Sequence, residues 1–218
     1  IQPQTRFAPR QCPRRRWLEV HHPELRQDSA ATTASFAAGL GIGDVARRLY
    51  APDGSGLLID AQAIGYAEAF DQTREALKTT QPIFEAGFIA GGALAFADVL
   101  LPIEQQDGTT AWRMIEVKSS GSVKDYHRDD ASIQSYVARQ SGLPLAGVAL
   151  AHVDTSWTYP GNGDYQGLLV EEDVTADALA RSAEVAEWIA DAHAVAGLAD
   201  EPRQPTGAHC HDPFECGF

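Results

Sequence analysis

The stretch from residue 94 to residue 118 reads LAFADVLLPIEQQDGTTAWRMIEVK. Two apolar runs, 94–101 and 111–118, flank an Asp107-Gly108 turn, which predicts two antiparallel strands. Asp98 interrupts the first run, and the second run ends on Glu116, Val117 and Lys118. Because side chains two residues apart on a strand point the same way, Glu116 and Lys118 share one face.

Charges in these positions indicate a metal site. A charge on a central strand costs free energy unless it is paired or bound to a metal. Two converging carboxylates, from Asp98 and Glu116, suit Mg²⁺ or Mn²⁺, which take oxygen ligands. Such a metal would polarise a phosphate and activate water, and Lys118 would orient that water. The alternative is that Glu116 and Lys118 pair harmlessly on an edge strand.

The flanking sequence predicts an α/β domain. Residues 1–28 are expected to be irregular, and glycines at 39, 41 and 43 are expected to divide a helix over 29–50. Further helices are predicted over 61–78, over 125–141, and from Thr175, as N-cap, to near Gly197. Strands are predicted over 83–89, 94–101, 111–118, 148–153 and 167–170. This order favours a mixed central sheet flanked by helices.

Composition excludes some classes of protein. Hydrophobic residues make up 44% and charged residues 22%, as in ordinary globular proteins. No apolar run is long enough to span a membrane and no secretory signal is evident, so we expect a cytoplasmic protein without a membrane partner. The missing initiator Met and abrupt end lead us to expect a piece of a longer protein.

The net charge of −13 alone argues against a nucleic-acid partner, because phosphate binding requires Lys and Arg. A metal-dependent site is itself acidic until its cations bind, so this objection is weak. Five arginines and no acid occupy the first sixteen residues, namely Arg6, Arg10, Arg14, Arg15 and Arg16. We expect Arg14, Arg15 and Arg16 to contact nucleic acid; a solvated terminus is the alternative.

Three cysteines, Cys12, Cys210 and Cys216, lie near the two ends of the chain and none lies between. An odd number does not suit a disulfide framework. The distribution favours metal ligands that join the termini. Zinc completed by His209 or His211 is one interpretation, and three free thiols are another.

The residues Asp98 and Glu116-Val117-Lys118, followed by DASIQSY over 130–136, resemble the RecB-type branch of the PD-(D/E)XK nucleases. The core similarity runs from about residue 85 to 153, and a weaker one covers nearly the whole chain. It is similar in particular to the iron–sulfur nucleases, which include the AddB nuclease domain, the CRISPR-associated spacer-trimming nuclease and uncharacterised bacterial RecB-like proteins.

This resemblance implies a restriction-endonuclease-like core and a metal-dependent deoxyribonuclease. Such an enzyme hydrolyses DNA phosphodiester bonds, exonuclease-like, on DNA with free ends or single strands. Asp98, Glu116 and Lys118 would be catalytic, with both acids as metal ligands. Gln134 would sit beside the metal and hold substrate or water, and Glu85 is an expected accessory ligand.

Tyr136 departs from the pattern of the branch, which spaces Gln and Tyr four residues apart. Here the spacing from Gln134 is two, about 200° round a helix, so Tyr136 is either a DNA contact or a core residue.

The iron–sulfur relatives use one Cys before the core and three after it to hold a 4Fe–4S cluster. By resemblance, Cys12, Cys210 and Cys216 would be three ligands, and we expect the fourth beyond Phe218. The expected organisation is an Arg-rich segment over 1–28, a nuclease domain over 29–198 and a cysteine segment over 199–218. A further C-terminal domain of the same polypeptide is an expected partner.

Two other hypotheses stay open. One is a non-catalytic DNA-binding or scaffolding module with the same fold, and the intact Asp–Glu–Lys set argues against it. The other is an iron–sulfur redox or sensing protein.

Overall fold

The structure, a computed structural model, describes residues 11–218, and the expectations on Arg6 and Arg10 lie outside these residues. The chain divides into two compact units, each described by itself. One is the sheet unit, Ala38–Arg181; the other, the terminal unit, joins the N-terminal segment up to Ala37 to Ser182–Phe218. These boundaries differ from the expected 28/29 and 198/199, because the last long helix packs with the N-terminal segment.

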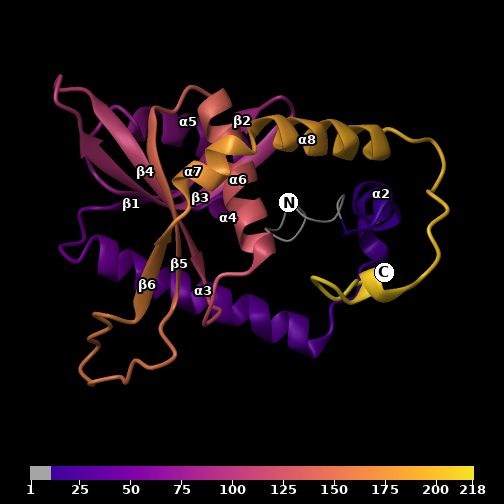
Figure 1. Cartoon of the computed structure of the whole chain (residues 1–218), viewed down its shortest axis with the longest axis horizontal. Helices are drawn as coiled ribbons and strands as arrows, with labels where there is room; N and C mark the ends of the chain where they lie inside the picture. Colours follow the sequence, from indigo (N-terminus) through magenta and orange to yellow (C-terminus); the bar gives the residue numbers. More distant parts are fainter. Residues whose placement is uncertain (1–10) are drawn as a thin grey trace. The chain divides into compact units, whose positions relative to one another are not determined.

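The sheet unit is built on six strands in the order of the sequence (Figure 1). They are β1 (Leu57–Leu58), β2 (Ile83–Ala90), β3 (Ala93–Glu104), β4 (Thr110–Lys118), β5 (Leu145–Val153) and β6 (Leu169–Asp173). β1–β2 and β4–β5 are parallel, and the other neighbours are antiparallel. The expected mixed sheet flanked by helices is therefore confirmed.

Helices cover both faces of this sheet. They are α3 (Ala30–Tyr50), α4 (Ala61–Ile64), α5 (Tyr66–Ala76), α6 (Asp125–Gln140) and α7 (Thr175–Ala180). Ala46 of α3 packs in one buried cluster with Val99 and Ile115. Ala131 of α6 packs in another with Leu150. Since strand side chains alternate, Glu116 and Lys118 point to the α6 face, opposite Ile115.

The terminal unit contains α2 (Pro13–His21), η2 (Pro23–Leu25), α8 (Ser182–Ala196) and η3 (Ala208–Cys210). Its two chain segments are joined by hydrogen bonds. The Trp17 indole donates to the Leu198 carbonyl at 3.0 Å, and the Gln27 amide donates to the Gly217 carbonyl at 2.8 Å. Ends far apart in sequence therefore form one unit.

Several element predictions were wrong at their boundaries. Residues 13–21 are helical, because Pro13 occupies the first turn and the Cys12 sulfur accepts a hydrogen bond from the Arg15 amide. α3 runs unbroken through its three glycines, which are tolerated at about 1 kcal/mol each. The predicted helix over 61–78 is divided at Gly65, whose φ is 86°.

The last predicted helix is also divided, into α7 and α8. Thr175 is its first residue, not its N-cap; its hydroxyl accepts a hydrogen bond from the Val148 amide instead. Within the part of the chain that is described, no helix is long and apolar enough to cross a membrane.

Candidate active site

Three acids occupy one row across three neighbouring strands. β3 and β4 pair Val99 with Ile115, and one further step in this register brings Asp98 opposite Glu116. On β2, Glu85 falls opposite Asp98, between two pairs of the β2–β3 register. Because opposite residues of paired strands have Cβ atoms about 5 Å apart on the same face, the backbone places Asp98 beside Glu116, and Glu85 occupies the next position in the row on β2.

Glu85 has an unusual backbone conformation. Its φ is 57°, in the left-handed region that side chains other than glycine seldom adopt. Such a conformation costs about 1–3 kcal/mol and is concentrated at functional sites. The strain therefore supports including Glu85 in the candidate site.

The Asp98 carboxylate is held against β4. Its Oδ2 accepts a hydrogen bond from the Val117 backbone amide at 2.7 Å. A charge-assisted bond of this kind fixes the orientation of a carboxylate. Asp98 therefore stays beside the end of β4, where Glu116 and Lys118 lie.

Lys118 is paired with two carboxylates from different elements. Its Nζ donates to Glu116 Oε1 at 2.7 Å and to Asp130 Oδ2, on α6, at 2.5 Å. The Lys118 side chain is 17% exposed, and those of both acids are 7% exposed. Burial alone lowers the pKa of Lys118, but Asp130, Glu116 and Asp98 together outweigh it and raise that pKa. The amine is therefore a fixed positive charge.

Helix α6 turns three polar residues toward the interior. His127, Asp130 and Gln134 are all buried, and their spacing of three and four places them on one helical face. The Gln134 amide is completely buried, and neither its nitrogen nor its oxygen has a hydrogen-bond partner among the described residues. Leaving such a group unsatisfied costs about 1–3 kcal/mol. Buried amides are normally satisfied by protein or by ordered water, so Gln134 is suited to hold water or substrate.

His127 is neutral at this site. Burial, followed by the Lys118 charge, lowers the pKa of His127 to about 4. Its Nδ1 accepts a hydrogen bond from the Lys124 amide at 3.1 Å, so the proton is on Nε2. Neither His127 nor Asp130 was identified from the sequence. The sequence did contain a signal for them. His127, Asp130 and Gln134 are spaced three and four residues apart, which puts three polar side chains on one face of the predicted helix.

The other predicted contact residues lie elsewhere. Tyr136 is half-buried on α6, two residues from Gln134. Arg15 is 2% exposed, donates to Glu19 at 3.2 Å and to Gln11 at 2.7 Å, and so is not placed to contact phosphate. The expectation that Arg15 binds nucleic acid is therefore corrected. Arg14 is partly exposed and forms an ion pair with Glu201.

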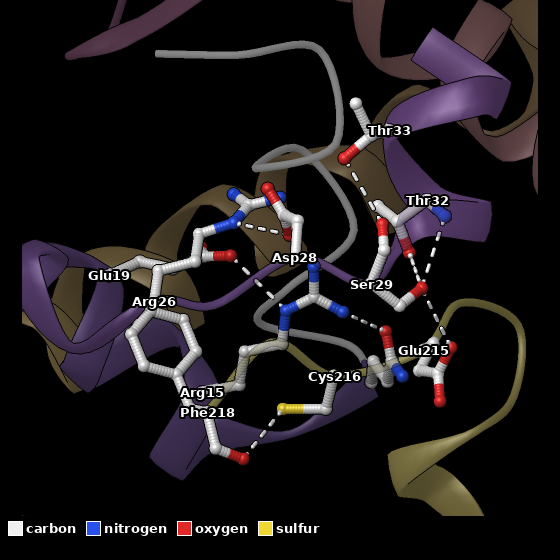
Figure 2. Close-up of polar contacts among 11 residues, drawn as sticks. Arg15, Glu19, Arg26, Asp28, Ser29, Thr32, Thr33, Glu215, Cys216 and Phe218 are labelled. Atoms are coloured by element: carbon white, nitrogen blue, oxygen red, sulfur yellow. Dashed lines mark hydrogen bonds and ion pairs between the residues drawn. The ribbon is translucent and has the colours of Figure 1, made fainter.

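The three cysteines all lie in the terminal unit. The Cys12 sulfur caps α2, the Cys210 sulfur lies 3.8 Å from the His209 ring, and the Cys216 sulfur donates to the Phe218 carbonyl (Figure 2). Among residues 11–218, no three His, Cys, Asp or Glu side chains are gathered as a metal site. In this arrangement the cysteines do not form a four-ligand cluster site, and the 4Fe–4S and zinc interpretations stay predictions.

A magnesium site needs fewer protein ligands than a zinc or iron–sulfur site. Mg²⁺ usually keeps several waters and takes one or two carboxylates, with substrate phosphate completing its shell. The donor set of Asp98 and Glu116 fits that chemistry, and Glu85 supplies a third acid in the same row. These residues would hold the cation.

Comparisons with known proteins leave the family open. No family model matches the chain, and no curated protein matches it. A solved structure described as "Crystal structure of SSO0001" is similar at 16% identity, covering 88% of this chain and 74% of that one, with a TM-score of 0.40.

Proposed function

We propose that the protein is a metal-dependent nuclease with a PD-(D/E)XK-type core that hydrolyses phosphodiester bonds in DNA. The observation that carries this proposal is the row of Glu85, Asp98 and Glu116, with the Lys118 amine bonded to Glu116 on the same face. Asp98, Glu116 and the Lys118 cation lie together at the end of β4, and Glu85 occupies the neighbouring position on β2. Metal-dependent phosphodiester hydrolysis uses metal-binding carboxylates together with a positive group that offsets the developing charge.

Each residue has a distinct task in this proposal. Asp98 and Glu116 hold Mg²⁺ or Mn²⁺, with Glu85 as an accessory ligand. The cation, when bound, polarises the scissile phosphate. Lys118 orients the attacking water and offsets negative charge as the phosphorus–oxygen bond breaks. The buried Gln134 amide holds that water or a phosphate oxygen, since it has no hydrogen-bond partner among the residues that the structure describes.

Asp130 acts through Lys118. Its carboxylate binds the Lys118 amine from the helix side, while Glu116 binds it from the strand side. When Glu116 turns to a cation, Asp130 keeps the amine in place. Asp130 is therefore a positioning residue, not a metal ligand.

The decisive test is cleavage of labelled single-stranded and double-stranded DNA by purified protein in Mn²⁺, Mg²⁺ or EDTA. We expect cleavage with either metal and none with EDTA. A protein that binds DNA but cuts nothing with either metal would instead be the scaffolding module. A labelled RNA strand in the same assay tests the preference for DNA.

We also propose that Cys12, Cys210 and Cys216 bind a 4Fe–4S cluster, with zinc as the alternative. Iron and zinc analysis together with the visible absorption spectrum separates the two. Stoichiometric zinc in colourless protein would favour zinc, and protein with neither metal would remove both.

A further inference from the structure

A long loop with three aromatic rings leaves the sheet beside the candidate active site. β5 ends at Val153, and residues 154–168 lead to β6, as the long orange loop in Figure 1. β4 and β5 are parallel, with Lys118 in register with His152. The loop therefore begins two residues beyond the neighbour of Lys118, at the same end of the strands.

The loop is attached to the segment that follows Lys118. The Val153 amide donates to the Ser120 carbonyl at 3.0 Å. A Cβ on Gly121 would lie 2.3 Å from the Thr155 methyl, so the two segments touch and leave no space for a side chain there. The position of the loop is thus coupled to the end of β4.

The rings of Trp157, Tyr159 and Tyr165 gather on this loop. Their centroids are 5.4 to 6.2 Å apart, and Tyr165 is stacked on each of the other two. The Trp157 indole donates to the Gln166 carbonyl at 2.8 Å, and the Tyr159 hydroxyl accepts from the Gly163 amide at 2.6 Å. These polar contacts hold the rings in place, although Tyr159 is 49% exposed.

The charge of the loop indicates whether it would bind the phosphates or the bases of a nucleic acid. Residues 154–168 contain Asp154 and Asp164 and no Lys or Arg. A phosphate would be repelled here, whereas every unpaired base has an apolar face that stacks on an aromatic ring. Paired bases hide these faces in the duplex, so a stacking site selects single strands.

We propose that the loop over 154–168 is a stacking platform for an unpaired base of the strand being cut, with Tyr159 as its exposed ring. This inference rests on the proposed nuclease function and narrows its substrate to nucleic acid with an unpaired segment next to the scissile phosphate. Because the platform carries no cation, its contribution to affinity is insensitive to salt, unlike that of phosphate contacts.

The test measures binding by fluorescence anisotropy, with the Lys118→Ala protein so that strands stay intact. The probes are labelled oligothymidylate and an abasic strand of the same length and charge. We expect Tyr159→Ala to weaken oligothymidylate binding about tenfold, equally at low and high salt, and to leave abasic-strand binding unchanged. Tyr159→Phe keeps the ring but loses the hydrogen bond from the Gly163 amide, so it should bind more tightly than Tyr159→Ala and no more tightly than the parent.

Equal losses on both strands, or no loss on oligothymidylate, would overturn the platform. If Tyr159→Ala lowers the unfolding temperature so far that it cannot be assayed, the parent decides, since it must itself prefer oligothymidylate about tenfold over the abasic strand. Protein that cuts DNA with Mn²⁺ but shows no such preference refutes the platform alone. Protein that neither cuts nor binds any strand refutes the nuclease.

Discussion

The molecule contains two buried cation–carboxylate groups that differ in construction. In the terminal unit, Arg15 pairs with Glu19, four residues away on the same helix, and both side chains are nearly inaccessible. In the sheet unit, Lys118 pairs with Glu116 on its own strand and Asp130 on a helix. The first pair lies within one helix, whereas the second joins a strand to the helix that follows it.

Their surroundings also differ. Arg15 donates to Gln11, whose own amide donates to backbone carbonyls of the C-terminal segment, including that of His209 at 2.7 Å. Lys118 lies beside Asp98 and Glu116 and faces helix α6, whose buried Gln134 amide has no hydrogen-bond partner among residues 11–218. Burial of a charge therefore does not identify a site. Strain, converging acids and an unsatisfied amide together distinguish a candidate active site from a structural ion pair.

The largest expected effect comes from deleting a carboxylate of the acid row. Asp98→Ala should reduce DNA cleavage to background and weaken Mn²⁺ binding, because it removes a ligand. Cleavage rates and calorimetric Mn²⁺ titration measure the two effects. Asp71→Ala, which removes an exposed acid of α5, is the matched control and should change neither. Undiminished cleavage by Asp98→Ala, with contaminating nucleases excluded, would show that the site is elsewhere.

For Arg15, unlike Asp98, we expect a loss of stability and no loss of cleavage. Arg15→Ala leaves Glu19 buried without its ionic partner and should lower the free energy of unfolding by about 3–5 kcal/mol. Cleavage by the protein that stays folded should not change. Arg14→Ala breaks a partly exposed pair with Glu201 and should cost less than about 1 kcal/mol. Denaturant titration compares the two, and similar small losses would mean that Arg15 has no structural role.

Lys118→Ala tests the chemistry without removing a metal ligand. We expect cleavage to fall by at least about 100-fold, as for the loss of one group that stabilises a transition state. Mn²⁺ binding should persist, since both carboxylates remain and a competing positive charge is gone. Lys78→Ala, which removes an exposed lysine paired only with the nearby Glu75 in the ion pairs of the described residues, is the control and should keep full activity. If Lys118→Ala cuts as well as the parent, Lys118 serves only as a structural counterion.

Much of the sheet could be predicted from the sequence, because alternating apolar residues and turn signals fix β3 and β4. The pairing of Asp98 with the end of β4 followed from that hairpin. Asp130 and His127 could not be found in this way, since their proximity to Lys118 depends on how α6 packs across the sheet. Local sequence predicts which side chains share a strand face, but it does not predict which helix residues pack against that face.

The terminal unit shows the same limit. Residues 1–28 were expected to be irregular, with Arg14, Arg15 and Arg16 in contact with nucleic acid. Pro13 is typical of the first turn of a helix, but the many Pro and Arg residues of this segment led to the prediction of irregular structure. Burial of Arg15 arises from contacts with Glu19 and Gln11, which become visible only when the segment folds as α2.

The smallest expected effect concerns His127 and the pH dependence of stability. Its pKa is about 4 in the folded protein, against about 6.5 when unfolded, because burial and the Lys118 charge disfavour protonation. The unfolded chain therefore binds more protons between these values, so the stability from neutral His127 is present above pH 6.5 and is lost as pH falls toward 4. Between pH 7 and pH 5 this loss amounts to about 2 kcal/mol.

His127→Gln keeps a polar side chain of similar size that does not titrate. Its free energy of unfolding should consequently fall by about 2 kcal/mol less than that of the parent between pH 7 and pH 5, as measured by denaturant titration at each pH. His211→Gln removes an exposed histidine of the terminal unit and is the matched control. Equal pH dependence in His127→Gln and the parent would mean that His127 titrates alike in the folded and unfolded states. Burial and the nearby Lys118 charge would then not disfavour protonation of His127 in the folded protein.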